Sequence, residues 1–190
     1  IIEVWVVCPI LVGILAILIH SVASRVLRRI APNSIWQRIP HALLILSACY
    51  ISFSLGANHV GTAMGPITNL EINPAWLSVL GGVALAAGVL TFGRRVTETV
   101  GGGITRLDTL SAFSAQMAAA LAVHFFSIIG IPVSTSQATV GAVLGVGLLH
   151  GVRAVRMRKI GEIVIGWVAA PTAAGLFSYG LYRLLAFVWN

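Results

Sequence analysis

A short polar segment at residues 131–138 interrupts an apolar stretch and constrains the fold more than any other feature. It separates apolar runs at 110–129 and 138–149, and it contains a proline, three consecutive hydroxyl residues and an amide. In lipid, such a break leaves backbone N–H and C=O groups without partners, which costs several kcal/mol for each group. The segment is therefore expected to line a cavity or to be buried within protein.

The same segment carries a signal for the start of a helix. Ser134 is followed by Gln137 at the third helical position, which is the pattern of a capping box. A helix that begins here has free backbone N–H groups and a positive dipole end, both of which suit an anion. A well-capped helix after an ordinary loop explains the spacing equally well, so the pattern alone leaves both interpretations open.

The composition places the whole chain in a membrane. Of its 190 residues, 58% are hydrophobic and 9% are charged, whereas soluble domains carry about 25% charged residues. The net charge of +7 lies at the ends of the apolar runs rather than on one face, which argues against nucleic acid as a partner. The lipid bilayer is the expected partner, and the predicted fold class is an all-α integral membrane protein.

Basic clusters divide the chain into segments. They lie near 25–38, 94–106 and 153–159, and the positive-inside rule places all of them on the cytoplasmic side. Two similar pentapeptides, WVVCP and WVAAP, each lie in an apolar run. The first run ends at a basic cluster, whereas the second begins after one, so the two helices are expected to cross the membrane in opposite directions. This arrangement favours an inverted-topology repeat. The expected organisation is a last helix of a first repeat at 1–30, a cytoplasmic loop at 31–40, and a second repeat at 41–190 with cytoplasmic loops near 94–108 and 150–160. The chain starts inside an apolar segment, and the repeat explains this start if the chain is a piece of a longer protein.

A second polar group follows the apolar run at 41–55. The chain is expected to break at Gly56, and Asn58 and His59 lie beside this break. An ionisable residue at membrane depth is a functional candidate by default, although a neutral, hydrogen-bonded His59 explains its presence equally well. Both residues are therefore included in the predicted site.

Two patterns with a spacing of four residues surround this point. Ser54, Asn58 and Thr62 would form one polar stripe on a helix. Small residues form a neighbouring face with the same spacing, and a second such pair follows the polar break; both are interpreted as surfaces of close helix packing. The small residues are Ala57, Gly61 and Gly65 in the first face and Gly141 and Gly145 in the second.

At three places the sequence resembles a known family. GANHVGTAMGP at 56–66, GRRVTETVGGGIT at 93–105 and PVSTSQATVGAVLGVG at 132–147 are similar to motifs of the inorganic phosphate transporter (PiT) family. The resemblance covers most of 40–190 and implies a secondary transporter built from inverted repeats with broken or re-entrant helices. It also implies transport of inorganic phosphate coupled to Na⁺ or H⁺, and relatives within the family move sulfate.

The resemblance carries over to some site residues and not to others. Asn58, Ser134 and Thr135 match the motifs and are expected to contact the anion or the cation. The signature Asp is His59 in this chain, and the Thr and His of the third motif are replaced, so those roles do not transfer. The complete predicted site consists of Asn58, His59, Thr62, Ser134, Thr135, Ser136 and Gln137.

The predicted function is a multi-pass secondary-active transporter of an inorganic oxyanion in the cell membrane, with phosphate as the first choice and sulfate as the alternative. A passive anion channel and a non-transporting membrane subunit are the alternatives from other classes. The sequence contains no nucleophile–base–acid set and no metal motif, so an enzyme is not expected. No cofactor other than bound Na⁺ is expected. The expected partners are phosphate or sulfate, Na⁺ or H⁺, the bilayer and the first repeat, and a homodimer stays open.

Overall fold

The computed structural model describes residues 2–30, 38–70, 72–100, 107–152 and 155–189, and all regular structure in these residues is helical. In chain order the elements are α1 (Ile2–Ile30), α2 (Arg38–Met64), the 3₁₀ helix η1 (Gly65–Leu70), α3 (Pro74–Val100), α4 (Thr109–Ile128), α5 (Thr135–Leu149) and α6 (Met157–Trp189). Five of the described helices, α1, α2, α3, α4 and α6, are long and apolar enough to cross a bilayer. The expected all-α integral membrane fold is thereby confirmed.

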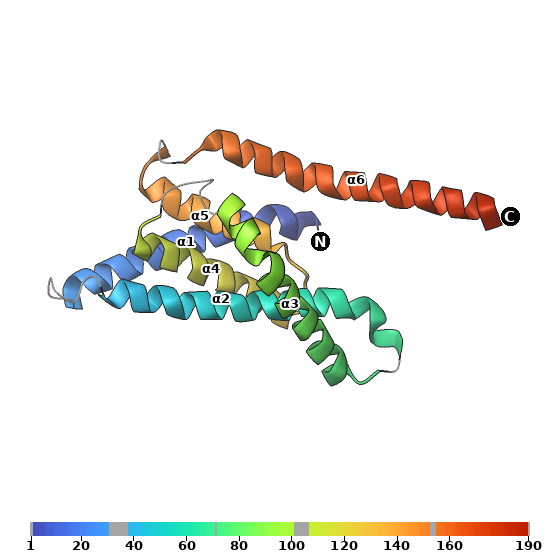
Figure 1. Cartoon of the computed structure of the whole chain (residues 1–190). Coiled ribbons are helices and arrows are strands. Elements are labelled where there is room, and N and C mark those ends of the chain that lie inside the picture. The colour runs from blue at the N-terminus through green and yellow to red at the C-terminus, as the bar shows by residue number, and fades with distance from the viewer. Residues whose placement is uncertain (1, 31–37, 71, 101–106, 153–154, 190) are drawn as a thin grey trace. The chain divides into compact units, whose positions relative to one another are not determined.

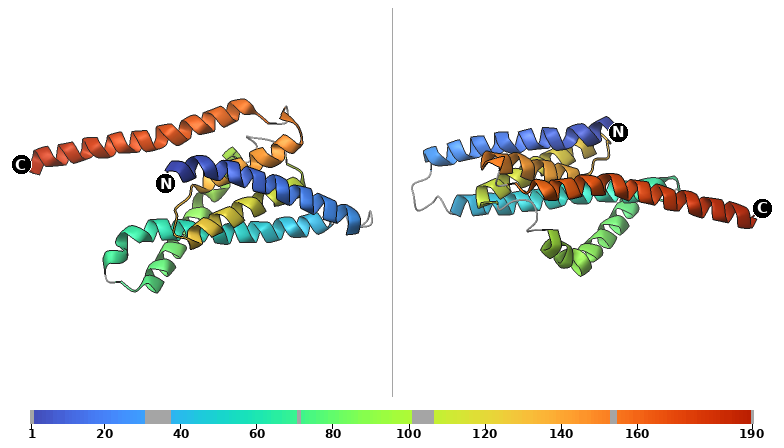
Figure 2. Two further views of the ribbon diagram at one scale, coloured as in Figure 1. Left: turned by 180° about the vertical axis from the view of Figure 1, so that it is seen from behind. Right: turned by 90° about the horizontal axis from the view of Figure 1, so that it is seen from above.

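The chain forms two compact units, 1–155 and 156–190. In the first unit α1, α2, α4 and α5 lie side by side (Figure 1), and the view from behind shows the same bundle (Figure 2). α1 and α5 run in one direction, whereas α2 and α4 run in the other (Figure 1). α3 packs against the C-terminal part of α2, where Gly81 meets the side chain of Met64. The second unit is a single helix, α6, of 33 residues.

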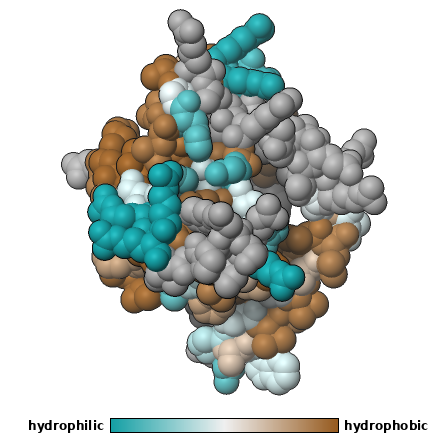
Figure 3. Space-filling view, turned by 90° about the vertical axis from the view of Figure 1, so that its left-hand side faces the viewer, coloured by the Kyte–Doolittle hydropathy of each residue, from teal (hydrophilic) through white to brown (hydrophobic). Residues whose placement is uncertain are grey.

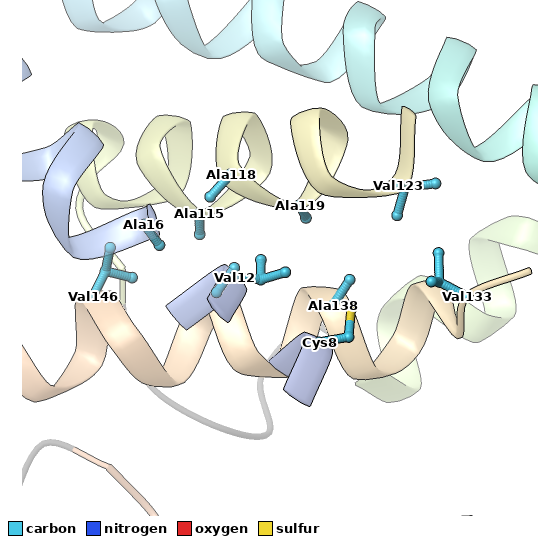
Figure 4. Packing of buried hydrophobic residues seen from close by; sticks show 11 residues of the cluster. Cys8, Val12, Ala16, Ala115, Ala118, Ala119, Val123, Val133, Ala138 and Val146 are labelled. Carbon is cyan, nitrogen blue, oxygen red and sulfur yellow. The ribbon is translucent and has the colours of Figure 1, made fainter. Parts of the chain in front are cut away.

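The bundle interior is made of small side chains, whereas large apolar side chains face outward. Cys8, Val12 and Ala16 of α1 lie between α4 and α5 (Figure 4). Their partners on α4 are Ala115, Ala118, Ala119 and Val123, and those from the linker and α5 include Val133, Ala138, Ala142 and Val146. Outward-facing residues such as Leu90, which is 86% exposed, suit a lipid surface. Small interior residues let helix backbones approach closely, as in other membrane proteins.

Glycines on α5 place its backbone directly against α1. A Cβ at Gly141 would lie 2.2 Å from the carbonyl oxygen of Pro9, and one at Gly145 would lie 2.2 Å from that of Gly13. Real Cβ atoms do not approach backbone so closely, so only glycine fits at these two positions. The prediction that this pair forms a close packing face is confirmed.

The expected break at Gly56 is wrong, because α2 continues without interruption to Met64. A glycine within a helix costs only about 1 kcal/mol relative to alanine, which the rest of the helix tolerates. The change to 3₁₀ geometry occurs at Gly65, directly before Pro66, whose ring disfavours helical geometry in the preceding residue.

The packing role expected for the small face at 57, 61 and 65 is also wrong for the described part of the chain. A Cβ built at Gly61 or at Gly65 would meet no atom within 4 Å. This small-residue face of α2 is therefore open, although it has the same spacing as the packed face of α5. A small residue allows a neighbouring helix to approach closely, but it does not determine whether a helix lies there.

The segment after 109 forms a helical hairpin. α4 has 20 residues and α5 has 15, and the turn between them uses Gly130 at a φ of +73°. The predicted loops are shorter than expected, because 38–40, 94–100 and 157–160 are helical. Residues 31–37, 101–106 and 153–154 of those loops lie outside the described residues. The assignment of 1–30 and 41–190 to two repeats stays a prediction.

Candidate functional site

The hairpin tip presents the start of α5, as the capping pattern predicts. Ser134 has the extended conformation of an N-cap, with φ −76° and ψ 110°, and its hydroxyl accepts a hydrogen bond from the N–H of Gln137 at 3.4 Å. Only this half of the capping box is formed. The side-chain Oε1 of Gln137 is buried and has no hydrogen-bond partner in the described structure.

Asn58 of α2 holds the linker that precedes α5. Its side-chain Nδ2 donates to the carbonyl oxygen of Val133 at 3.3 Å, and its Oδ1 accepts from the hydroxyl of Ser127 at 3.4 Å. Asn58 is only 8% exposed. These bonds join α2, the end of α4 and the linker, so 56–65 and 132–137 lie next to each other.

One turn of α2 and the first turn of α5 meet through polar side chains. The Nε2 of His59 lies 3.3 Å from the hydroxyl of Thr135, with donor and acceptor set by the histidine tautomer. The hydroxyls of Ser134 and Ser136 are 3.0 Å apart. Thr62 is exposed, and its hydroxyl donates to the backbone carbonyl of Asn58 at 2.9 Å.

A cavity of about 510 Å³ joins these residues. Its lining includes six of the seven predicted site residues: Asn58, His59, Thr62, Ser134, Thr135 and Ser136. Gln137 is buried and is not in that lining. Whether the six bind an ion stays a prediction.

A second cavity, of about 400 Å³, extends over the open small-residue face of α2. It is lined by Ala57, Gly61 and Gly65 on one side and by the linker on the other, and it shares Asn58 and Thr62 with the first cavity. Because these small residues carry no bulky side chains, the groove between α2 and the linker stays open.

The two linings contain hydroxyls, an amide, an imidazole and the start of a helix. Among the described residues neither lining includes Asp, Glu, Lys or Arg. An anion there would be held by neutral donors and by the helix dipole, which binds phosphate-like groups at helix N-termini. In the part of the chain that the structure describes, no group of three or more His, Cys, Asp or Glu could hold a metal ion.

Two residues that the sequence did not suggest also belong to this region. Trp5 of α1 lines the first cavity, and Ser127 lines the second and bonds to Asn58. Ser127 could have been suspected as a polar residue in the last turn of an apolar helix. No local pattern around Trp5 predicts that α1 reaches the hairpin tip.

A profile described as the phosphate transporter family matches residues 27–178. A Methanocaldococcus jannaschii protein named "Putative phosphate permease" is 34% identical over 183 residues, covering 95% of this chain and 58% of that protein. Sodium-dependent phosphate transporter 2 of Xenopus tropicalis is 36% identical over 159 residues, covering 77% of this chain and 24% of that protein.

A solved structure also resembles the chain. It is described as the sodium-dependent phosphate transporter, and it aligns with a TM-score of 0.71 at 25% sequence identity. The alignment covers 88% of this chain and 61% of the solved one. The chain therefore spans about a quarter to three fifths of the length of these relatives.

Proposed function

Because the chain belongs to the phosphate transporter family, we propose that it forms part of a secondary-active transporter that carries inorganic phosphate across the cell membrane. Support comes from the relatives whose names give phosphate as the substrate and from a solved phosphate transporter with a similar fold. Several apolar helices of spanning length agree with a multi-pass protein. In this proposal the chain is a transporter component and not an enzyme.

The observation that carries the proposal is the meeting of the α5 N-terminus with one turn of α2. Thr135 lies 3.3 Å from His59, and Asn58 bonds to the linker at 3.3 Å. The first-turn N–H groups of α5, the hydroxyls and the imidazole can together surround a tetrahedral oxyanion. Without a Lys or Arg in the described lining, the anion would be bound weakly enough to leave again, which transport requires.

The proposed organisation keeps two repeats. Residues 1–30 are the last helix of a first repeat and 41–190 are the second repeat, so the first repeat would complete the site. Two observations favour this organisation. Trp5 of α1 lines the same cavity as the hairpin tip, and the pentapeptides shared by the two apolar runs each place a proline, Pro9 and Pro171, inside a helix. A second copy of the chain, forming a homodimer, is a further proposed partner.

The coupling ion is Na⁺ or H⁺. A relative named as sodium-dependent favours Na⁺. His59 favours H⁺, because an imidazole is a poor Na⁺ ligand but can accept and release a proton. Uptake of radiolabelled phosphate into proteoliposomes should be measured with a Na⁺ gradient alone and with a pH gradient alone. Uptake driven by Na⁺ and indifferent to pH would exclude proton coupling.

The same assay tests transport itself. A transporter accumulates phosphate above the external concentration while the gradient lasts, whereas a channel only equilibrates it. Binding of radiolabelled phosphate to the purified chain in detergent provides a second readout that does not require a complete transport path. No binding and no uptake would favour a non-transporting subunit.

Sulfate remains the second candidate because the described lining of the first cavity has no carboxylate. At neutral pH phosphate carries at least one O–H group that needs an acceptor, whereas sulfate only accepts. An unpaired buried donor costs about 1–3 kcal/mol, which gives roughly tenfold discrimination or more. Excess sulfate that fails to inhibit phosphate uptake would remove sulfate as a substrate, and sulfate uptake that phosphate fails to inhibit would remove phosphate.

A further inference from the structure

A second polar cavity lies at the opposite end of the first unit, where α1 ends and α2 and α4 begin. We propose that this cavity binds a phosphate group, either free orthophosphate or the phosphomonoester of a lipid headgroup. The binding site is separate from the hairpin tip and does not depend on the transport activity proposed above. Figure 3 shows this end of the molecule, where hydrophilic side chains gather between hydrophobic ones.

The cavity has a volume of about 760 Å³ and is formed by four helices. His20 and Arg28 come from α1, His41 from α2, Asp108 from the start of α4, and His150 from the end of α5. These residues come from four different helices, so the polar cluster exists only because the bundle brings the helices together.

Its charge favours an anion. Arg28 carries a permanent positive charge, and Arg25 lines a smaller adjoining cavity together with His20 and Arg28. Asp108 is the only acidic residue in either described lining. The imidazoles offer N–H donors to an anion, and the N-terminal end of α4 contributes its positive dipole.

Two of the histidines, His20 and His150, interact directly. The rings of His20 and His150 meet edge to face with centroids 6.1 Å apart, and the Nε2 of His150 lies 2.9 Å from the hydroxyl of Ser111. The Nδ1 of His20 is buried and has no hydrogen-bond partner in the described structure. A buried polar atom without a partner is unusual, so the cluster is incomplete by itself.

Asp108 gives the cavity a preference for phosphate over sulfate. Its carboxylate caps α4 by accepting from the N–H of Ser111 at 2.9 Å, and a carboxylate has acceptor capacity beyond that bond. Burial alone would raise its pKa, but the hydrogen bonds from Ser111 and the neighbouring His150 and His20 outweigh burial, so the pKa lies below its ordinary value. Asp108 is therefore ionised at neutral pH and can accept the O–H of phosphate. Fully ionised sulfate has no such hydrogen to donate.

The test uses the five histidines as separate reporters. The full chain, labelled with ¹⁵N-histidine, is placed in nanodiscs of pure phosphatidylcholine and titrated with inorganic phosphate at pH 6.5. Signals of His20 and His150 should shift with added phosphate, and Arg28→Gln should weaken this response at least about tenfold. Arg29→Gln removes the same charge one residue further along, at a residue outside both cavity linings, and should leave the response unchanged.

A second arm separates the two sources of phosphate. Nanodiscs that contain phosphatidic acid are compared with pure phosphatidylcholine without added phosphate. A shift of His20 and His150 with lipid alone identifies a headgroup site, and a shift with free phosphate alone identifies a soluble ligand. No shift with either source, or equal shifts in Arg28→Gln and the parent chain, would overturn the proposal.

A third measurement examines selectivity. Asp108→Asn keeps a good N-cap residue but removes the charge, so α4 should stay folded. The parent chain should respond to phosphate at lower concentration than to sulfate, and Asp108→Asn should narrow this difference. An unchanged phosphate-to-sulfate ratio in a folded variant would contradict the role given to Asp108.

Discussion

Two faces of small residues have the same spacing in the sequence and opposite environments in the structure. On α5, Gly141 and Gly145 touch the backbone of α1, and a Cβ at either position would lie 2.2 Å from a carbonyl oxygen. On α2, Gly61 and Gly65 have no atom within 4 Å of the corresponding position. One face closes a helix pair, whereas the other leaves a groove of about 400 Å³ beside the hairpin linker.

Small residues at four-residue spacing therefore have two separate roles in this fold. Against α1 they allow dense packing, which fixes α5 in place. On α2 they keep side chains out of the space beside the start of α5. The packed face thus positions the helix start, and the open face gives room in front of the linker that leads to it.

A single added methyl group tests most directly whether the two small-residue faces differ in packing. Gly145→Ala should destabilise the protein by about 1–3 kcal/mol or more, because its Cβ would clash with a backbone oxygen that cannot turn away. Gly61→Ala is the matched control and should be neutral or stabilising by up to about 1 kcal/mol. Thermal unfolding in detergent measures both variants. Equal melting temperatures would show that the two faces do not differ in packing.

Binding at the open side depends on the hydroxyls of the first α5 turn. Ser134→Ala and Thr135→Ala should each weaken phosphate binding by about 1.5–3 kcal/mol, or roughly tenfold to a hundredfold. Thr139→Ala removes a hydroxyl one turn later that bonds to its own helix, and it should have no effect. Equilibrium binding of radiolabelled phosphate in detergent checks all three variants.

Ser134 needs a further variant because it also caps α5. Ser134→Asp retains a good cap but adds a negative charge, so stability should persist while phosphate binding is lost. Normal binding by a well-folded Ser134→Asp protein would mean that the residue serves the helix alone.

A side-chain hydrogen bond from Asn58 joins the linker to α2. Asn58→Ala should remove the bond to the carbonyl of Val133 and free the linker, at about 1–3 kcal/mol. Hydrogen–deuterium exchange should then rise in peptides covering 129–137. Thr62→Ala breaks a bond within α2 only and should not change that exchange. Unaltered exchange in Asn58→Ala would show that other contacts hold the linker.

The smallest expected effect concerns the cap of α4, at the far end of the packed bundle. The folded pKa of Asp108 lies below its unfolded value, so its contribution is present above the unfolded pKa near 3.9 and is lost as pH falls through the folded pKa. The side chain is exposed, so the contribution should stay below about 1 kcal/mol. Melting temperatures between pH 5 and pH 3 should fall slightly less in Asp108→Asn than in the parent chain. A steeper fall in the variant would reverse the assigned direction.

Much of the geometry of the candidate site could be predicted because its signals are local. The N-cap at Ser134 depends on residues three positions apart, and a polar stripe through Asn58 and Thr62 follows from helical spacing. The stretches at 56–66 and 132–147 both resemble motifs of one family, and in the structure hydrogen bonds between α2 and the hairpin join them.

The failures concern interactions across the fold. Gly56 was expected to break α2, but glycine is only a weak helix breaker and the following residues continue the helix. The packing of Gly141 against Pro9 depends on two residues more than a hundred positions apart, and the openness around Gly61 depends on which helix does not lie there. No local pattern contains that information, and the reach of Trp5 to the hairpin tip was missed for the same reason.

The shortness of α5 has an electrical consequence. Its 15 residues extend for about 22 Å, whereas the hydrocarbon layer is about 30 Å thick. If its C-terminal end lies at one interface, Ser134 lies below the other surface and is reached through water from that side. The membrane potential then drops across a thinner insulating layer. Because one charge moved through 100 mV changes energy by about 2.3 kcal/mol, occupancy of the hairpin tip by an anion should depend on voltage.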